Sequence, residues 1–519
     1  MMNTELVFVD SLAAAGNDYD ALVVVASDLG NLPAEIADTV AAAQRVNAKV
    51  ASSTQVLLCD KAPGQRLILA PTGPVNRDFD DVRRFYDAAR SAALAAVDAG
   101  ARKPLLWVPA APQAQTQADD FAHAVEAVWF GFAQGIWQPL EAREHFGDEI
   151  EGIQQVGLIR SAALSAETSA EWLQAVEAGR RVARDLCGTE PERMAPLRFA
   201  EYCQKAFANS PVKVTVIDDK PQLEHEYPLL AAVGRASFGT HQRPCVIRLE
   251  YTPEGAVEQT LMLVGKGITY DTGGADLKTG GHMAGMSRDK GGAAGVAGFV
   301  KAVAGIRPQG VKVVAELAVV RNNIGALAFV SDEIIVGRSG VRVRIGNTDA
   351  EGRLVMADCL AKLVIEAAGE TKPSVYTVAT LTGHAALAKG PYTALVPNKA
   401  ARQGGFVDAL LNAGELWSDP AELSPSRRED FDFVRGRTKA DDLLSSNNGP
   451  SATTRRGHQF PMAFLHEVAG LDKHDASSSQ PIPYVHIDIA GSGVEGGDWQ
   501  HGKPTATPVL AFAGAFLRK

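Results

Sequence analysis

The segment TLMLVGKGITYDTGG, residues 260–274, contains the pattern on which the interpretation of the chain depends. Its first five residues form an apolar run that predicts a buried β-strand over 260–264. The Gly-rich stretch that follows predicts a loop whose backbone passes close to a ligand. A nucleotide site is only weakly indicated, because the loop lacks the GxxxxGK[ST] spacing of a phosphate-binding loop. A helix is expected next, over 291–304, so this part forms a strand–loop–helix unit.

The same strand–loop–helix order recurs in the second part of the chain. Strands are expected over 212–217, 246–250, 260–264, 311–320 and 374–380, and a second helix over 352–368. This order predicts an α/β fold with a mainly parallel, mixed central sheet and helices on both faces. In such sheets the functional groups collect at the carboxyl ends of the strands.

The first third of the chain predicts a separate, smaller α/β domain. Its expected strands cover 6–9, 21–26, 56–58, 66–70 and 105–108, and its expected helices cover 33–46 and 79–97. This domain contains no recognisable catalytic cluster, so it is interpreted as a scaffold or assembly domain. A helix expected over 171–187 ends before Thr189-Glu190-Pro191. The predicted organisation is an N-terminal α/β domain at 1–170, a linker helix at 171–190 and a catalytic α/β domain at 191–519.

Bulk composition agrees with a two-domain globular protein. The chain has 519 residues, of which 46% are hydrophobic and 22% charged, and its net charge is −10. This charge weighs against general binding to nucleic acid or to anionic membranes. No apolar run approaches the roughly 20 residues that span a bilayer, and the N-terminus does not resemble a secretory signal. The expected location is therefore the cytoplasm.

The five cysteines point to no disulfide framework. Cys59, Cys187, Cys203, Cys245 and Cys359 are scattered, and no two of them form a CxxC pair. A cysteine-based zinc site is not indicated either, so they are expected to be reduced and packed in the interior.

A second motif, NTDAEGRL at residues 347–354, contributes further carboxylates that could bind metal. In an extended backbone, Asp349 and Glu351 point to the same side, where two carboxylates repel each other unless a cation lies between them. Glu351 also opens the expected helix, whose positive end favours an ionised carboxylate. Together with Asp271 and Asp289, these residues predict four carboxylates at the end of one sheet, a group that about two divalent ions would neutralise. From spacing alone, a nearby lysine could either bind metal or stabilise an oxyanion.

At these residues the chain resembles the leucine aminopeptidase family of dinuclear metallopeptidases. NTDAEGRL is present in full, the pattern GKGxxxDxGGxxxK matches at 265–278, and MxxDxxGAA matches at 286–294. The strong likeness covers residues 261–383, and a weaker one reaches the segment HIDIAG at 486–491. The first domain resembles the family only in its position and α/β character.

The resemblance implies a role for each matching residue. One metal ion would be bound by Lys266, Asp271, Asp289 and Glu351, and the other by Asp271, Asp349 and Glu351. Lys266 would then be a neutral ligand, whereas Lys278 would be the charged group that polarises the scissile carbonyl. Arg353 would hold a bicarbonate ion that helps to deprotonate the attacking water.

The resemblance also implies a substrate cleft. The residues expected to line it are Met286, Thr380, Leu381, Gly383 and Ala490. Three features depart from the common pattern of the family. The segment 322–332 lacks the proline expected there, His384 stands where a small residue is common, and the segment 492–494 after Ala490 offers little side-chain bulk. These departures leave the metal ligands intact and suggest an altered or wider side-chain pocket.

The function implied is a metal-dependent aminopeptidase that releases N-terminal residues from peptides by metal-activated water. The alternatives are a narrow dipeptidase of the same fold, acting for example on cysteinyl-glycine, and a non-catalytic or DNA-binding member of the family. The implied cofactors are two divalent ions, Mn²⁺ or Zn²⁺ with Mg²⁺ as an alternative, and bicarbonate near Arg353. The implied assembly is a homohexamer, and neither a membrane nor nucleic acid is an expected partner.

Overall fold

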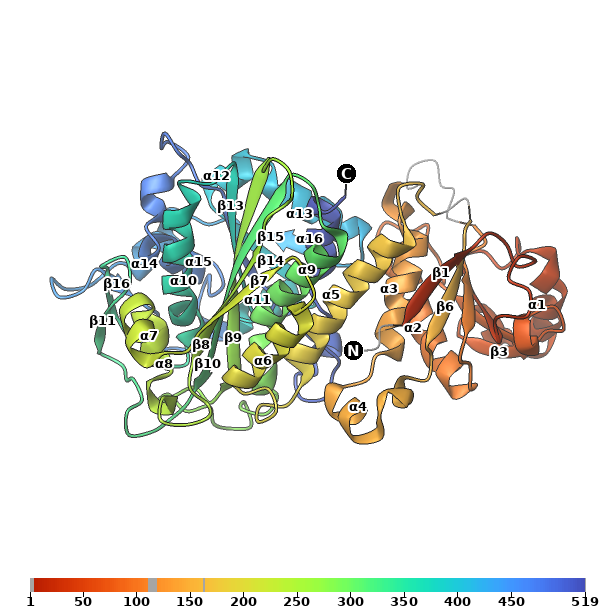
Figure 1. The fold of residues 1–519 in the computed structure, drawn as a ribbon, viewed down its shortest axis with the longest axis horizontal. Coiled ribbons are helices and arrows are strands. Elements are labelled where there is room, and N and C mark those ends of the chain that lie inside the picture. The colour runs from red at the N-terminus through yellow and green to blue at the C-terminus, as the bar shows by residue number, and fades with distance from the viewer. Residues whose placement is uncertain (1–3, 111–118, 162–163, 519) are drawn as a thin grey trace. The chain divides into compact units, whose positions relative to one another are not determined.

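The computed structural model describes residues 4–110, 119–161 and 164–518, which divide into two compact units (Figure 1). The first unit comprises the described residues up to Ala178 together with 413–419, and the second comprises 179–412 and 420–518. Helix α5 (Ala170–Gly188) crosses the point where the chain passes from the first unit to the second. No helix in the described part of the chain is long and apolar enough to cross a membrane.

The first unit is built around a six-stranded sheet of order β1-β6-β5-β2-β4-β3. Its strands are β1 (Glu5–Val9), β2 (Ala21–Ala26), β3 (Gln55–Leu58), β4 (Arg66–Pro71), β5 (Pro104–Trp107) and β6 (Gln155–Ile159). Only β3 runs antiparallel to its neighbour. The helices include α1 (Ala34–Val46), α2 (Arg83–Asp98) and α3 (Ala124–Ile136). The predicted α/β character of this part is confirmed.

The sequence prediction of the first unit lacked the strand β6 and the helices α3 and α4 (Leu140–Phe146). Every residue of α3 is buried, in the sequence AVEAVWFGFAQGI. A helix that is buried on all sides shows no one-sided apolar stripe, so periodicity alone does not reveal it.

The second unit is built around an eight-stranded mixed sheet of order β15-β14-β17-β13-β9-β10-β8-β7. Its strands are β7 (Lys213–Ile217), β8 (Cys245–Tyr251), β9 (Gln259–Asp271), β10 (Val311–Asn322), β13 (Pro373–Ala379), β14 (Thr393–Pro397), β15 (Ala421–Leu423) and β17 (Tyr484–Asp488). The four adjacent strands β17, β13, β9 and β10 are parallel to one another, whereas β8, β7 and β14 are antiparallel to their inner neighbours. The predicted mixed sheet with a parallel centre is confirmed.

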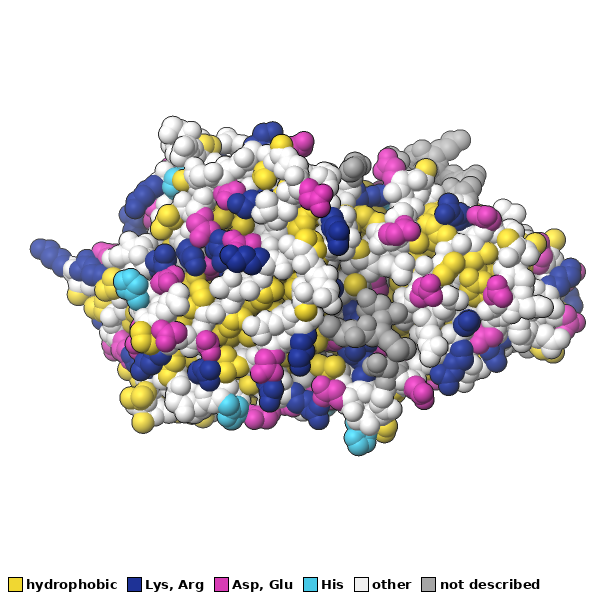
Figure 2. Space-filling view, viewed as in Figure 1, with side chains coloured by type: hydrophobic (Ala, Val, Ile, Leu, Met, Phe, Trp, Pro, Cys, Tyr) yellow, Lys and Arg dark blue, Asp and Glu magenta, His cyan; other side chains and the backbone are white. Residues whose placement is uncertain are grey.

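Helices cover both faces of this sheet (Figure 1). On one face α10 (Glu351–Ala367) packs with α15 (Phe460–Val468) over a large apolar core that includes Met262, Val264 and Leu360. The helix α9 (Gly291–Ile306) packs with α6 (Pro196–Phe207) on the other. On the face drawn in Figure 2, basic and acidic side chains are interspersed rather than segregated.

One expectation about the central strand was wrong. The strand was predicted to end at residue 264, with a loop from Gly265 onward, but β9 continues to Asp271. Gly265 serves close packing here rather than a turn, because a Cβ built on it would lie 2.5 Å from Cα of Ala293 in α9. The extra residues carry the strand to the edge where the candidate site lies.

Candidate metal centre

The predicted site residues come from three segments that meet at the carboxyl end of the sheet. Lys266 and Asp271 belong to β9, and Asp271 is its last residue. Asp289 lies in the 3₁₀ helix η6 (Met286–Lys290), directly before α9. Asp349 and Glu351 follow β12 (Arg342–Arg344), and Glu351 is the first residue of α10. The end of β9, the helix η6 and the start of α10 therefore bring together residues that are up to 85 positions apart in the chain, from Lys266 to Glu351.

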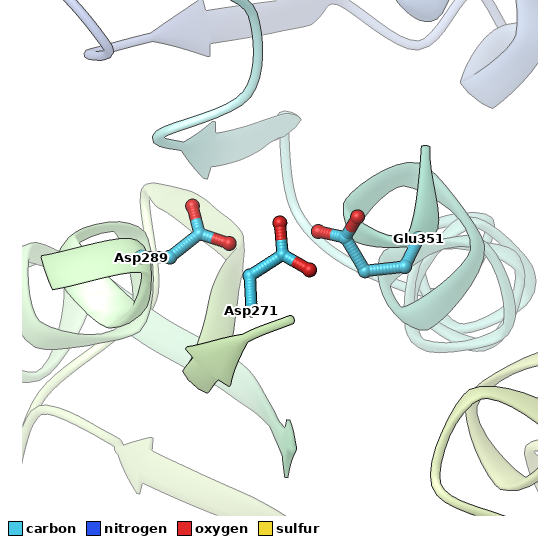
Figure 3. Close-up of side chains that lie close together, drawn as sticks. All are labelled: Asp271, Asp289 and Glu351. Atoms are coloured by element: carbon cyan, nitrogen blue, oxygen red, sulfur yellow. The ribbon is translucent and has the colours of Figure 1, made fainter. Parts of the chain in front are cut away.

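Three carboxylates converge closely enough to hold one ion. Asp271, Asp289 and Glu351 each offer an oxygen, and these oxygens lie within 4.8 Å of one another. Figure 3 shows Asp271 between the other two, with the carboxylates turned toward one another. All three side chains are buried, so their mutual repulsion is poorly screened by water. Asp349 lies beside this trio rather than within it.

Two lysines interleave with the carboxylates. Nζ of Lys266 lies 2.9 Å from Oδ2 of Asp289 and 3.0 Å from Oε1 of Glu351. Nζ of Lys278 lies 2.9 Å from Oδ2 of Asp271 and 2.5 Å from Oδ1 of Asp349. Both ammonium groups thus compensate negative charge. They differ in exposure, because the side chain of Lys266 is 3% exposed and that of Lys278 is 15% exposed.

The pKa values show how crowded the negative charge is. Burial, followed by repulsion from the other carboxylates, raises the pKa of Asp349 to about 7. Burial also raises the pKa of Asp289 and of Glu351. The pKa of Asp271 is lowered instead, because Lys278 and Lys266 outweigh the effect of its burial. Burial opposes the charged form of Lys266, but the surrounding carboxylates prevail and raise its pKa.

The carboxylate oxygens retain capacity for a cation. Oε2 of Glu351 is buried and has no hydrogen-bond partner among the described residues, and Oδ2 of Asp289 and Oε1 of Glu351 are buried with only their ion pairs to Lys266. Buried polar atoms are normally satisfied, so such a group needs an explanation. Hard divalent cations prefer ligands of this kind, and these residues therefore fit a metal centre.

Asn322 and Thr348 support the site, although sequence analysis did not identify them. Nδ2 of Asn322 donates to Oδ1 of Asp271 at 2.8 Å and to the carbonyl of Thr348 at 3.1 Å. Asn322 ends β10 and pairs with Asp271 across the sheet. The sequence signal for Asn322 is a polar residue at the end of the strand next to β9. This signal can be used only when the ends of both strands and their pairing are known.

Arg353 is the third residue of α10, and it is 2% exposed. Its guanidinium donates to the carbonyl of Ser445 at 3.0 Å and lies 4.9 Å from the ring centre of Phe460. Among the described residues it forms no ion pair, and its buried Nε has no hydrogen-bond partner. Burial lowers the pKa of Arg353 to about 10. The charges of Glu351 and Asp488 oppose this shift without forming an ion pair, and a buried cation with no ion-pair partner favours an anion beside it.

The predicted cleft residues lie around the same sheet edge. Thr380 and Leu381 follow β13, and Oγ1 of Thr380 donates to Oδ1 of Asp289 at 2.9 Å. Gly383 begins the short helix α11 (Gly383–Lys389). Met286 begins η6, and Ala490 follows β17.

The histidines lie outside the cluster of carboxylates. His282 is exposed, and no described metal cluster includes it. His486 is buried, and its Nδ1 lies 2.8 Å from Oγ1 of Thr377. Nδ1 of His384 lies 2.7 Å from Nδ1 of His458, so the two rings share a hydrogen bond beside the predicted cleft segment.

The chain is similar in sequence to known proteins. Residues 181–513 match the model of the catalytic domain of the cytosol aminopeptidase family, peptidase M17. A Caenorhabditis elegans protein named as an aminopeptidase is 41% identical over 504 residues, covering 95% of this chain and 94% of the relative. A protein of Leifsonia xyli named as a cytosol aminopeptidase is 33% identical over 417 residues, covering 79% of this chain and 77% of the relative.

Solved structures share the fold. Leucyl aminopeptidase from Trypanosoma cruzi has a TM-score of 0.79 at 21% identity, covering 100% of this chain and 98% of that one. The enzyme from Trypanosoma brucei, solved with bestatin, has a TM-score of 0.79 at 22% identity, covering 100% and 96%. The bottromycin maturation enzyme BotP, solved with Mn, has a TM-score of 0.76 at 22% identity, covering 96% and 98%.

Proposed function

The chain belongs to the cytosol aminopeptidase family and is a metal-dependent aminopeptidase, and we propose that it removes N-terminal residues from peptides with two divalent ions held by the cluster around Asp271. The observation that carries this proposal is the convergence of Asp271, Asp289 and Glu351 with Lys266 and Lys278 at one buried sheet edge. Such a concentration of buried carboxylates suits divalent cations better than it suits an apolar ligand.

In this proposal the ligands divide between two ions. Lys266, Asp271, Asp289 and Glu351 would bind one ion, and Asp271, Asp349 and Glu351 the other. The exposures of the lysines support giving the ligand role to Lys266, because it is the more deeply buried of the two. The ions would supply the Lewis acid that activates water and polarises the peptide carbonyl. Mn²⁺ and Zn²⁺ are the proposed ions, with Mg²⁺ as an alternative, and the Mn bound to BotP fits this choice.

Lys278 and Arg353 would act on the reacting groups. Lys278 is the more exposed lysine, and it would donate a hydrogen bond to the carbonyl oxygen as negative charge develops there. Arg353, a buried cation that forms no ion pair with the described residues, would hold bicarbonate. Bicarbonate would supply the acid–base group for moving a proton from water to the leaving amine. Met286, Thr380, Leu381, Gly383 and Ala490 would line the cleft for the peptide.

The first unit and the assembly complete the proposal. The part at 1–170 would serve assembly, 171–190 would be the linking helix, and 191–519 would carry catalysis. The proposed assembly is a homohexamer, which rests on the family resemblance, and light scattering of the purified protein tests it. The proposed location is the cytoplasm, which agrees with the name of the relative from Leifsonia xyli.

The test begins with protein that has been stripped of metal by a chelator. Mn²⁺ or Zn²⁺ is then added back, and cleavage is measured on a panel of aminoacyl-amides, dipeptides and longer peptides. Metal-restored release of the N-terminal residue from several panel members is the expected result. Cleavage of dipeptides alone would favour the narrow dipeptidase, and no restored cleavage of any member would contradict the enzymatic proposal.

A further inference from the structure

Asp488 is a buried carboxylate that none of the proposed catalytic steps uses. It is the last residue of β17, the strand beside β13, and its side chain is 0% exposed. Among the described residues it forms no ion pair, and burial raises its pKa, although its hydrogen bonds and the charge of Lys266 act in the opposite direction. A buried carboxylate without a cationic partner costs free energy unless hydrogen bonds compensate for it.

Three hydrogen bonds provide this compensation. The backbone N–H groups of Leu381 and Ala490 both donate to Oδ1 of Asp488 at 3.1 Å. The hydroxyl of Thr382 donates to Oδ2 at 2.6 Å. Hydrogen bonds to an ionised carboxylate are stronger than those between neutral groups, so these contacts hold their donors firmly.

The three donors belong to two different segments. Leu381 and Thr382 follow β13, whereas Ala490 follows β17. In the proposed function both segments line the peptide cleft. The carboxylate of Asp488 therefore joins two walls of that cleft and fixes their separation.

The segment after β13 also touches the proposed metal ligands. The carbonyl of Thr380 accepts a hydrogen bond from Nζ of Lys266 at 2.9 Å. Oγ1 of Thr380 donates to Oδ1 of Asp289, also at 2.9 Å. Because Leu381 is the next residue, a shift of its N–H away from Asp488 would displace the Thr380 carbonyl.

We propose that Asp488 is a positioning residue of the aminopeptidase, which holds the wall at 380–383 and the wall at Ala490 in register with the metal centre. Asp488 itself does not contact the substrate. This inference rests on the proposed function, because it assigns a support to the cleft which that function requires.

The test compares Asp488→Ala with Asp488→Asn in the full chain at saturating Mn²⁺. Asp488→Ala removes all three contacts, so KM should rise by about tenfold or more and the ratio of kcat/KM between large and small N-terminal residues should change. Asp488→Asn should restore most of both quantities. Its amide oxygen can accept from Leu381 and Ala490, and its amide N–H can donate to a rotated Thr382 hydroxyl.

Asp358 offers a matched control. It is buried in α10 with 1% exposure and accepts hydrogen bonds from the backbone N–H groups of Leu229 and Arg338, each at 2.7 Å. It contacts neither wall of the cleft. Asp358→Ala should lower the melting temperature and leave KM and the selectivity ratio unchanged.

Calorimetric titration with Mn²⁺ is included for each variant, so that loss of metal is measured apart from loss of cleft geometry. If the wild-type protein cleaves no peptide, the proposed function fails. If it does cleave, the inference is overturned when Asp488→Ala keeps the wild-type KM and selectivity at equal Mn²⁺ occupancy, or when Asp358→Ala changes them equally. If Asp488→Ala does not fold, Thr382→Val removes one of the three contacts, together with the 3.1 Å hydrogen bond that Thr382 accepts from the backbone N–H of Ala385. This variant should shift KM in the same direction, and an unchanged KM there also overturns the inference.

Discussion

Gly352 lies directly against Lys266, the most deeply buried lysine of the candidate metal centre. A Cβ built on Gly352 would lie 2.6 Å from Cε and 2.7 Å from Nζ of Lys266. Lys266 cannot easily withdraw, because its ammonium group is held by Asp289, Glu351 and the carbonyl of Thr380. The glycine of NTDAEGRL is thus explained by the packing of α10 against β9, not by an unusual backbone angle.

We therefore expect Gly352→Ala to weaken metal binding. The added methyl group would displace Nζ of Lys266 from its partners, and the affinity for Mn²⁺ should fall by about tenfold or more. Calorimetric titration of chelator-treated protein measures this change. Gly369→Ala is the control, because a Cβ there would meet only the carbonyl of Glu366 at an ordinary 3.7 Å. Equal Mn²⁺ affinities for the two variants would contradict the expected role of this contact.

The two lysines should respond differently to substitution. Lys278→Ala should lower kcat by roughly 10²- to 10³-fold, as expected for loss of a group that stabilises an oxyanion, while the Mn²⁺ content persists. Lys266→Met should instead lower the Mn²⁺ content. Elemental analysis after dialysis, together with kcat at saturating Mn²⁺, separates the two effects. If Lys278→Ala loses the metal and Lys266→Met keeps it, the proposed roles are reversed.

Sequence patterns were sufficient for three of the four parallel central strands of the second unit, β9, β10 and β13, because these strands are apolar and lie in a chain order of strand, loop and helix. The fourth, β17, was not predicted. Sequence patterns failed where packing, rather than periodicity, determines structure. The glycines at 265 and 267 suggested a loop, but they lie within β9, where the strand passes close to α9. Helix α3 was not predicted because it is buried on all sides and shows no one-sided apolar pattern.

In the candidate site, too, some residues could be predicted from the sequence and others depend on tertiary contacts. Motif spacing identified Asp271, Asp289 and Glu351, which the sheet brings within 4.8 Å. Asn322 carries no motif, and its contact with Asp271 depends on the register between β9 and β10, which shifts just before it. Asp488 belongs to the segment HIDIAG, which resembles the family only weakly. Its hydrogen bonds reach two loops that are far apart in the sequence, so no local pattern predicts its role.

Divalent metal should stabilise the second unit. The carboxylates at the site repel one another, and burial and this repulsion hold the pKa of Asp349 near 7. A ligand that binds only the folded state stabilises it by about 2.7 kcal/mol at a concentration of 100 times its Kd. Mn²⁺ should therefore raise the melting temperature of chelator-treated protein, as measured by calorimetry. Asp289→Ala should reduce the increase, and an undiminished increase in that variant would place the bound ion elsewhere.

His458 should make the stability of the metal-free protein depend on pH below neutrality. The ring is 2% exposed, its Nε2 lies 2.7 Å from Oγ of Ser424, and its Nδ1 lies 2.7 Å from Nδ1 of His384. The pKa of His458 is lowered from 6.5 to about 4, mainly by burial and also by repulsion from His384, Lys389 and Arg456. Asp430 forms an ion pair with Arg456 and thereby reduces part of this repulsion.

A histidine whose pKa is depressed on folding is neutral in both states above pH 6.5, and it destabilises the folded state as the pH falls from 6.5 toward 4, because only the unfolded state then takes up a proton. This destabilisation should reach at most about 3 kcal/mol for this ring. We expect the melting temperature of the wild-type protein to fall more steeply between pH 7 and pH 5 than that of His458→Gln, since glutamine keeps hydrogen-bonding capacity but does not titrate. His225→Gln, at an exposed position in α7 (Lys220–Glu226), is the control and should follow the wild-type slope. If the melting temperatures of the wild type and of His458→Gln fall equally with pH, protonation of His458 is not coupled to unfolding between pH 7 and pH 5.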